Sequence, residues 1–315
     1  MKKIPLVSVM VATYNQKDVV EQTLQSIVDQ SYENVEIIIS DDCSSDGTQS
    51  ILTRFAESNP QVLLFLQKKN LGITANYNFL AEKCNGKYVA TFSGDDVMMP
   101  TKIERQVEAL EADEGSSFCH HAVTILDYHS NVPGKTLTRK YVNNITTIHD
   151  VLRGFGIPGS MTLMYRRSLV TNPAFEPAIS TASDWLHIIK LTMTGRGIYL
   201  NESLCFYRQD FEYNGKDPSS YEDDFLKTIA IARKLYAKPG DEVDKSCDYA
   251  RARYFLGKGF RKLAKGDGAE CRNALKYPAR HPALFFLATI LFILSYISVS
   301  KNFLRLSKKL FHFLT

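Results

Sequence analysis

The stretch VEIIISDDCSSDGT, residues 35–48, decides the fold class of this chain. Its first five residues are almost continuously apolar, which predicts a strand buried on both faces, as in a parallel sheet covered by helices. The residues that follow are polar and turn-forming, so the strand ends in a loop. Ligands of such a sheet bind at the carboxyl ends of its strands, and the loop 40–48 is therefore expected to border a ligand site.

The same strand-and-loop pattern repeats on both sides of this stretch. Strands are predicted at residues 6–12, 35–39, 62–66 and 88–92, with helical apolar spacing between them at 19–28, 51–55 and 73–84. Strands joined by helical crossovers form right-handed βαβ units and a parallel sheet. Further elements are helices at 101–110 and 184–193, strands at 117–126 and 198–207, and a hairpin or loop around Pro133-Gly134. We therefore expect an α/β fold with a nucleotide-binding, Rossmann-like and mostly parallel sheet flanked by helices, followed by C-terminal helices at 219–237 and 241–265.

The composition is that of a globular protein. The chain has 315 residues, of which 44% are hydrophobic and 23% charged, and this excludes a disordered, collagen-like or small disulfide-stapled protein. The six Cys include no CxxC pair, so the sequence predicts neither a zinc ribbon nor a disulfide framework. The apolar run after Lys3 breaks at Thr13, which is too early for a secretory signal, and we expect a cytosolic protein.

The net charge of +4 is unevenly distributed along the chain. Seven basic and no acidic residues lie in 271–315, which leaves 31 basic against 34 acidic residues in 1–270. A nucleic-acid-binding protein is expected to spread basic side chains over its folded domain. The slightly acidic body therefore argues against a nucleic-acid partner.

Adjacent aspartates follow two of the predicted strands. Asp95 and Asp96 come directly after the strand 88–92, and two neighbouring carboxylates stay ionised only beside a cation or hydrogen-bond donors. Mg²⁺ and Mn²⁺ take few protein carboxylates and complete their shell with phosphate oxygens, so the pair suits a metal–diphosphate complex. The alternative is turn and N-cap chemistry before the helix at 101–110.

Two other acidic positions are open to both a functional and a structural interpretation. Asp41, after the second strand, suits hydrogen bonds with a uracil ring or ribose hydroxyls, but the loop 40–48 is equally a polar turn and helix cap. Asp184 precedes Trp185, the one tryptophan of the chain, and taken by itself it is interpreted first as a helix N-cap. Arg208 closes the last predicted strand, and a surface salt bridge is its default interpretation.

The order of these segments is more specific than any one of them. The segments are VSVMVATYN (7–15), VEIIISDDCSSDGT (35–48), KNLG (69–72), YVATFSGDDVMMP (88–100), SDW (183–185) and FYR (206–208). Together, over residues 4–212, the chain resembles the family 2 glycosyltransferases with the GT-A fold and is similar to those that build bacterial O-antigen or capsule. The resemblance implies transfer of a sugar from a nucleotide-sugar donor, foremost a UDP-sugar, to an acceptor hydroxyl, with inversion and with Mn²⁺ or Mg²⁺.

The resemblance also implies roles for individual residues. It places Ala12, Tyr14, Asp41 and Asp95 at the nucleotide sugar, Asp96 on the metal, and Asp184 as the general base. Three departures from the family pattern are visible: Ser93 and Ser183 replace acids, and Asp210 replaces a frequent His. Because the four matching aspartates are present, we expect an active enzyme.

Two alternatives remain open at this point. The missing acids at Ser93 and Ser183 would also fit a non-catalytic nucleotide-sugar or glycan-binding protein on the same fold. A nucleotidyltransferase would share the metal–diphosphate chemistry, but it would carry a Gly-rich, basic loop after the first strand, and ATYNQKD (12–18) is not such a loop.

The tail of the chain predicts contact with a membrane. Residues 283–299 carry no charge over 17 almost wholly apolar positions, and as a helix they span about 26 Å. Residues 301–314 have the pattern of a basic interfacial helix. We expect a re-entrant or monotopic anchor at the cytoplasmic face of the membrane in preference to a true span, with a core helix as the alternative. A lipid-linked acceptor, foremost polyprenyl-diphosphate-linked, or an oligosaccharide acceptor would then be the partner.

These expectations divide the chain into three parts. Residues 1–212 form the catalytic domain, with a nucleotide-sugar-binding half at 1–100 and an acceptor and base half at 101–212. Residues 213–270 form a helical extension, and residues 271–315 form the membrane-associating tail.

Overall fold

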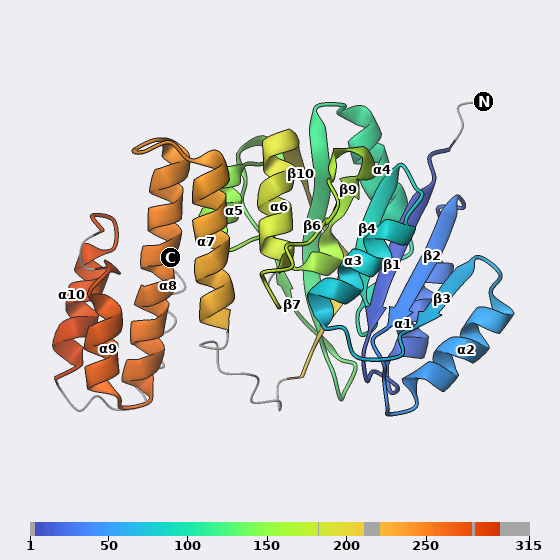
Figure 1. Ribbon diagram of the computed structural model, residues 1–315, viewed down its shortest axis with the longest axis horizontal. Helices are drawn as coiled ribbons and strands as arrows, with labels where there is room; N and C mark the ends of the chain where they lie inside the picture. Colours follow the sequence, from blue (N-terminus) through green and yellow to red (C-terminus); the bar gives the residue numbers. More distant parts are fainter. Residues whose placement is uncertain (1–3, 182, 211–220, 279–280, 297–315) are drawn as a thin grey trace. The chain divides into compact units, whose positions relative to one another are not determined.

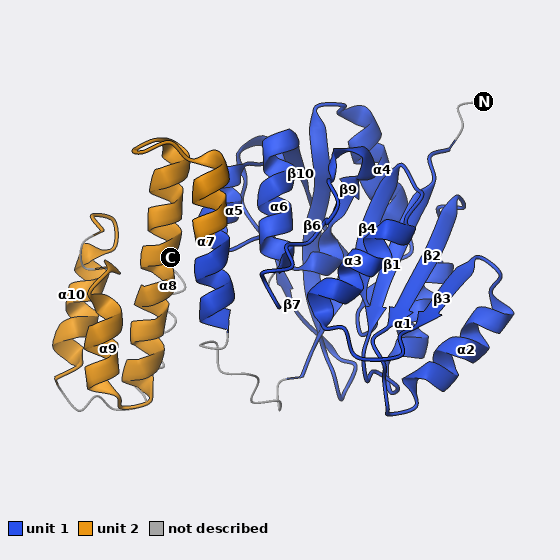
Figure 2. Cartoon of the chain, viewed as in Figure 1, with its two compact units in different colours: residues 1–228 blue, residues 229–315 orange. Residues whose placement is uncertain are grey.

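A computed structural model describes residues 4–181, 183–210, 221–278 and 281–296 of the chain. The chain divides into two compact units, residues 1–228 and 229–315 (Figure 2). Each unit has a hydrophobic core of its own. The assignment of functions to 1–212, 213–270 and 271–315 stays a prediction.

The first unit is built on one ten-stranded sheet (Figure 1). Its strands run in the order β3 (Val62–Leu66), β2 (Val35–Asp41), β1 (Val7–Thr13), β4 (Tyr88–Ser93), β9 (Met164–Arg166), β6 (Ser116–Asp127), β10 (Arg196–Gln209) and β5 (Val97–Met98). Two further strands pair at the side, β7 (Pro133–Leu137) with β6 and β8 (Ile145–Thr146) with β10. Pairing is parallel among β3, β2, β1 and β4 and between β6 and β10, whereas β9 is antiparallel to both of its neighbours. The predicted α/β class with a sheet flanked by helices is confirmed. The sheet is mixed: its longer pairings are parallel, and the shorter pairings of β5, β7, β8 and β9 are antiparallel.

Most helices fall where the apolar spacing predicts them. In the first unit they are α1 (Val20–Val28), α2 (Thr48–Ser58), α3 (Ile73–Lys83), α4 (Lys102–Ala112), α5 (Ile148–Gly154) and α6 (Ser183–Thr194). Short 3₁₀ turns lie at Val142–Asn144, Ser160–Thr162 and Arg167–Leu169. Helix α7 (Glu222–Tyr236) begins in the first unit and ends in the second, which also contains α8 (Glu242–Ala264), α9 (Gly268–Leu275) and α10 (Phe285–Leu294). Of these helices, α5 and α9 were not predicted.

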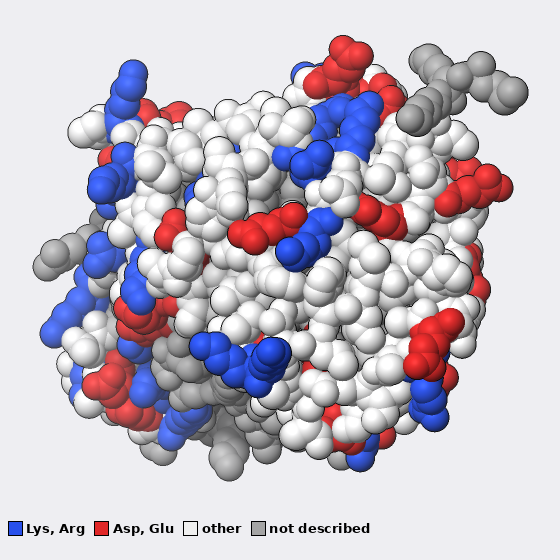
Figure 3. Space-filling model, turned by 45° about the vertical axis from the view of Figure 1, so that its right-hand side comes forward, with Lys and Arg blue, Asp and Glu red and all other residues white. Residues whose placement is uncertain are grey.

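The continuous apolar run of β2 explains its place inside the sheet, away from the edge. Its last five residues are buried, and it pairs with β1 on one side and β3 on the other. The region around Pro133-Gly134 forms β7, the second strand of a hairpin with β6. Charged side chains of both signs are interspersed on the face shown in Figure 3. Ion pairs on the surface of the first unit include that of Arg196 with Asp113.

Lys102, the first residue of α4, is an exception among the buried side chains. Its Nζ is fully buried, donates a hydrogen bond to Gln106 Oε1 (2.9 Å) and lies 5.7 Å from the centre of the Phe92 ring. Burial lowers the pKa of this amine to about 8. A lysine whose pKa is lower in the folded than in the unfolded state binds fewer protons when folded. Its burial therefore lowers the free energy of unfolding at pH values below the pKa of the unfolded state.

We therefore expect a distinct pH dependence when Lys102→Met is compared with the wild type. The free energy of unfolding of the wild type should rise relative to that of the variant between pH 8 and 10.5, by about 3 kcal/mol. Urea titrations across this range measure the difference, with the exposed Lys234→Met as a control that should show no such trend. A difference between wild type and Lys102→Met that stays constant with pH would contradict the assignment.

The second unit places α10 against α8 and α9. Leu284, Ala288 and Leu291 are buried in its core, whereas Phe285, Phe286, Ile290, Phe292 and Ile293 are exposed, Phe286 to 74%. Within the part of the chain that the structure describes, no helix combines the length and the apolar character that crossing a membrane requires. The predicted interfacial helix at 301–314 lies outside the described residues.

Candidate active site

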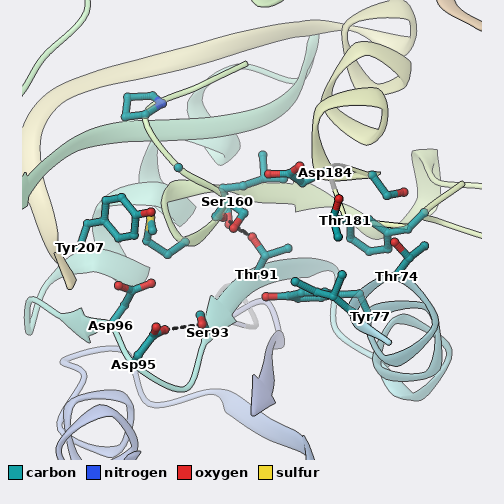
Figure 4. A pocket seen from close by; sticks show the side chains of 17 residues that line it. Thr74, Tyr77, Thr91, Ser93, Asp95, Asp96, Ser160, Thr181, Asp184 and Tyr207 are labelled. Atoms are coloured by element: carbon teal, nitrogen blue, oxygen red, sulfur yellow. Dashed lines mark hydrogen bonds between the residues drawn. The ribbon is translucent and has the colours of Figure 1, made fainter. Parts of the chain in front are cut away.

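A cavity of about 330 Å³ opens at the carboxyl end of β4. It is lined by the first turn of α3, the loop after β4, residues 158–163 and the start of α6 (Figure 4). Six Ser and Thr side chains line it: Thr74, Thr91, Ser93, Ser160, Thr181 and Ser183. Its titratable residues are Asp95, Asp96, Asp184, Tyr77 and Tyr207, and the described lining contains no Lys, Arg or His.

The acidic pair at the end of β4 forms one side of this cavity. Asp96 is buried, and its Oδ1 accepts a hydrogen bond from the backbone N–H of Arg208 (2.9 Å), while Asp95 accepts one from the Ser93 hydroxyl. Burial, and then the charge of Asp95, raise the pKa of Asp96 well above its ordinary value, and Arg208 offsets only part of this rise. A cation beside the pair would stabilise both ionised carboxylates.

Arg208 supports the loop that carries the pair. It is buried at the end of β10, so its interpretation as a surface salt bridge is wrong. Its Nε donates to the backbone carbonyl of Asp95 (2.8 Å), its Nη2 to Gln22 Oε1 (2.6 Å) and its Nη1 to Asn131. The guanidinium therefore holds the backbone at Asp95 and places a positive charge close to the two aspartates.

Asp184 lies in the same cavity, on the side formed by α6. The helix begins at Ser183, so Asp184 occupies its first turn, and Oδ1 accepts the backbone N–H of Trp185 (2.9 Å). Burial raises the pKa of this carboxyl, and the Trp185 hydrogen bond offsets part of the rise. A carboxylate with a raised pKa that faces a cavity is suited to accept a proton.

Asp41 occupies a different environment. It is fully buried, and its carboxylate accepts hydrogen bonds from Thr13 Oγ1 (3.0 Å), the backbone N–H of Ser44 (2.8 Å) and Gln49 Nε2 (2.8 Å). It therefore ties the end of β1 to the loop before α2. Ala12 lies near the same end of β1, and Tyr14 follows the strand and is exposed. None of these three residues lines the cavity, and their contact with a nucleotide stays a prediction.

The cavity also contains residues that the sequence did not single out. Tyr77 projects from α3 and donates a hydrogen bond from its hydroxyl to the Phe92 carbonyl (3.1 Å), and burial followed by the charge of Asp95 raises its pKa. Tyr207 and Thr181 face the same space. Isolated hydroxyl groups in loops and on helices have no sequence pattern, so only the fold reveals that they converge.

The donor set of the acidic pair fits a divalent cation whose coordination shell is completed by a ligand. Among the described residues, no group of three or more His, Cys, Asp or Glu side chains converges on a possible metal site. Two carboxylates are, however, what Mg²⁺ or Mn²⁺ needs when phosphate oxygens and water supply the other ligands. Asp210 lies at the end of β10, with its Oδ1 3.2 Å from His129 Nε2.

Comparison with known proteins gives consistent results. The family model described as Glycosyl transferase family 2 matches residues 8–171, just over half of the chain. The teichuronic acid biosynthesis glycosyltransferase TuaG of Bacillus subtilis is 33% identical over 210 residues, which cover 65% of this chain and 79% of TuaG. A Campylobacter jejuni protein named GalNAc(5)-diNAcBac-PP-undecaprenol beta-1,3-glucosyltransferase is 26% identical over 299 residues, 90% of this chain and 93% of that protein.

Solved structures share the fold. S. aureus TarS in complex with UDP-GlcNAc superimposes with a TM-score of 0.66 at 16% identity, over 92% of this chain and 89% of the TarS chain. The mannosyltransferase PcManGT from Pyrobaculum calidifontis, in complex with GDP-Man and Mn²⁺, gives a TM-score of 0.63 at 19% identity, over 99% of this chain and 86% of the other. At these identities the likeness establishes the architecture alone.

Proposed function

Since this chain belongs to the family 2 glycosyltransferases, we propose that it is an inverting, divalent-metal-dependent enzyme that moves a sugar from a UDP-sugar to a hydroxyl of a lipid-linked glycan. One observation carries the proposal. Asp95 and Asp96, from the loop after β4, and Asp184, from the start of α6, line one cavity although 88 positions separate Asp96 from Asp184. A metal-binding pair and a proton acceptor on opposite sides of one space match a displacement at a sugar carbon.

The donor end of the site is assigned to the acidic pair. Asp96 is proposed as the direct ligand of Mn²⁺ or Mg²⁺, with Asp95 beside it at the nucleotide sugar. The bound cation supplies positive charge that offsets the charge developing on the leaving nucleoside diphosphate. Arg208 holds the loop after β4 in place through its hydrogen bonds to Asp95 and Asp96.

Asp184 is assigned as the general base. Its carboxylate accepts the proton of the acceptor hydroxyl as that oxygen bonds to the anomeric carbon and the bond from that carbon to the diphosphate oxygen breaks. The acceptor attacks from the face opposite the leaving group, so a single displacement inverts the configuration. This mechanism needs no covalent nucleophile. Ala12, Tyr14 and Asp41, at the ends of β1 and β2, are assigned to the nucleotide.

The comparisons support the choice of substrates. TarS is bound to UDP-GlcNAc and PcManGT to GDP-Man and Mn²⁺, which supports a nucleotide-sugar donor and a divalent metal. The Campylobacter jejuni relative is named for an undecaprenol-linked acceptor, and it covers most of this chain. We also propose a division of the chain into a catalytic part (1–212), a helical extension (213–270) and a membrane-associating tail (271–315), on the motifs of the first part and the apolar, basic character of the last.

A donor screen tests the proposed function. Released nucleoside diphosphate is measured with UDP-glucose, UDP-galactose, UDP-N-acetyl sugars, UDP-glucuronate and dTDP-rhamnose, in Mn²⁺ or Mg²⁺ and in EDTA. We expect one donor with an uncharged sugar to be turned over only with metal. UDP-glucuronate should be the poorest UDP-sugar, because the described lining carries three carboxylates and no base to pair with a fourth. Binding of a UDP-sugar without turnover of any donor would instead favour the non-catalytic alternative.

The exposed face of α10 supports attachment to the cytoplasmic surface of a membrane. Its exposed aromatic and aliphatic side chains lie in the segment that carries seven basic and no acidic residues, and apolar insertion and attraction to anionic lipids act together. We expect the triple variant Phe285→Ser, Phe286→Ser, Ile293→Ser to bind anionic liposomes at least about tenfold more weakly than the wild type.

Liposome flotation measures this loss of binding. Substitution is preferable to deletion of residues 279–315, because deletion would remove Leu284, Ala288 and Leu291 from the core of the second unit. UDP binding serves as the control and should stay unchanged, since every proposed donor contact lies before residue 212. Undiminished flotation of the triple variant would overturn the role of α10.

A further inference from the structure

The segment 179–181, just before Asp184, is held by hydrogen bonds to side chains from two helices that are distant in sequence. Thr74, in the first turn of α3, donates its hydroxyl to the backbone carbonyls of Ile179 (2.7 Å) and Ser180 (3.0 Å). These bonds hold the carbonyl groups of the segment. Its backbone N–H groups are bound by a side chain of α7, which lies 43 residues further along the chain from Thr181.

Asp224, in the first turn of α7, accepts these N–H groups. Its side chain is only 4% exposed, and its carboxylate accepts the backbone N–H of Thr181 (2.8 Å), the Thr181 hydroxyl (2.6 Å), the backbone N–H of Ser180 (3.2 Å) and the Ser180 hydroxyl (3.1 Å). Burial acts to raise the pKa of Asp224, but the hydrogen bonds from Thr181 and Ser180 outweigh it and lower the pKa. Hydrogen bonds to an ionised carboxylate are stronger than those between neutral groups, and removing one leaves a buried donor unpaired. Disturbing these four hydrogen bonds therefore costs free energy.

The neighbouring residue of α7 contacts the chain on the other side of Asp184. Phe225 stacks on Trp185, with ring centres 5.2 Å apart and planes at 14°, and Phe155 packs edge-on against both rings. The indole Nε1 of Trp185 donates to the Val151 carbonyl (3.0 Å). The first turn of α7 therefore contacts the chain both before and after Asp184, all within the first unit.

We propose that Asp224 is a positioning residue that holds the segment 179–181, and through it Asp184, in the geometry required for proton transfer. Thr181 lies in the cavity between Thr74 and Asp184 (Figure 4), so a shift of this segment displaces the base. The catalytic part of the inference rests on the proposed function, whereas the attachment of the segment to Asp224 does not. Displacements of about 1 Å in such positions cost on the order of 10²-fold in rate.

The isosteric change Asp224→Asn tests this role. The backbone N–H of Ser180 donates to Oδ1 and that of Thr181 to Oδ2. An amide keeps only one of these oxygens and has an N–H₂ donor in place of the other, so in this geometry one of the two N–H groups loses its acceptor. The matched control is Asp223→Asn, on the same helical turn, where the carboxylate is 77% exposed and pairs with Lys227 (2.7 Å). Hydrogen–deuterium exchange, UDP binding and steady-state kinetics are measured on the full chain, together with thermal unfolding to establish that each variant is folded.

We expect Asp224→Asn to speed amide exchange in peptides that contain Ser180 and Thr181 by at least about tenfold, while exchange in β1 to β4 stays unchanged. Its kcat should fall at least about tenfold, with the KM for the donor and the affinity for UDP within about twofold of the wild type. Ser180→Ala removes one of the four hydrogen bonds and should show smaller changes in the same direction. If Asp224→Asn does not fold, Ser180→Ala tests the proposal in its place. Asp223→Asn should match the wild type throughout.

The outcomes separate the two claims. Unchanged exchange in Asp224→Asn, or in Ser180→Ala if that variant must stand in, would overturn the attachment of the segment. Faster exchange with unchanged kcat would overturn the positioning role. A wild type that transfers no sugar from any donor would overturn the proposed function and the catalytic part of this inference, while the exchange measurement would still decide the structural part.

Discussion

Asp184→Asn is expected to lower the rate of sugar transfer by about 10²- to 10⁴-fold and to leave UDP binding unchanged. The amide keeps the size of the side chain, and its oxygen still accepts the backbone N–H of Trp185. It cannot take up the proton of an acceptor hydroxyl at neutral pH, so the general base is lost without a change of shape. Donor binding is spared because the proposed donor contacts lie on other elements.

The stability of the same variant separates lost chemistry from lost folding. Because the pKa of Asp184 is raised, the ionised carboxylate destabilises the folded state at pH values above that pKa. Asp184→Asn should therefore unfold at a temperature no lower than the wild type at pH 7, and single-turnover transfer and UDP titration complete the comparison. Near-normal kcat with the true acceptor would remove Asp184 from the mechanism.

Asp96→Asn is expected to abolish the metal-dependent part of UDP binding and to reduce transfer by about 10²- to 10³-fold. Asn is preferable to Ala, because its oxygen can still accept the backbone N–H of Arg208, which Ala would leave unpaired. The loss would come from the missing negative charge at the metal, since burial and Asp95 already make this position costly for a carboxylate without a cation.

Calorimetric titration of UDP measures this effect with Mn²⁺ and again in EDTA. The two proteins should differ with the metal and agree in EDTA, where the cation contributes nothing to either. If Asp96→Asn binds UDP with Mn²⁺ as tightly as the wild type, Asp96 is not the metal ligand.

Much of the first unit could be predicted from local patterns. The strands β1 to β4 are apolar runs that end in polar loops, and the helices between them have regular apolar spacing, so both follow from the chain itself. The placement of Asp95 and Asp96 at the edge of the sheet follows from the same argument. Strand β9, by contrast, is three residues long and is stabilised by β4 and β6 rather than by its own sequence, MYR, and it was not predicted.

The parts of the site that were missed depend on contacts between distant residues. Nothing near Asp224 or Thr74 in the sequence indicates that both bind the same backbone segment, because a single Asp or Thr in a helix is most often solvated. In the apolar stretch 283–299 the sequence pattern is strong, but it does not indicate which side chains are buried. Its sequence gives apolar residues on every side, and only the fold separates Leu284, Ala288 and Leu291, which are buried, from Phe285 and Phe286, which are exposed.

The position of β9 has a consequence for which substitutions the lining of the cavity can accept. Met164 and Tyr165 pair through backbone groups with Ala90 and Val89 of β4, and the backbone N–H of Thr91 donates to the Leu163 carbonyl (3.2 Å). Backbone hydrogen bonds do not depend on side-chain identity, so main-chain atoms set the register between β9 and β4. Substitutions along residues 158–163 can therefore change the lining of the cavity while the spacing of this segment from Asp95 and Asp96 is kept.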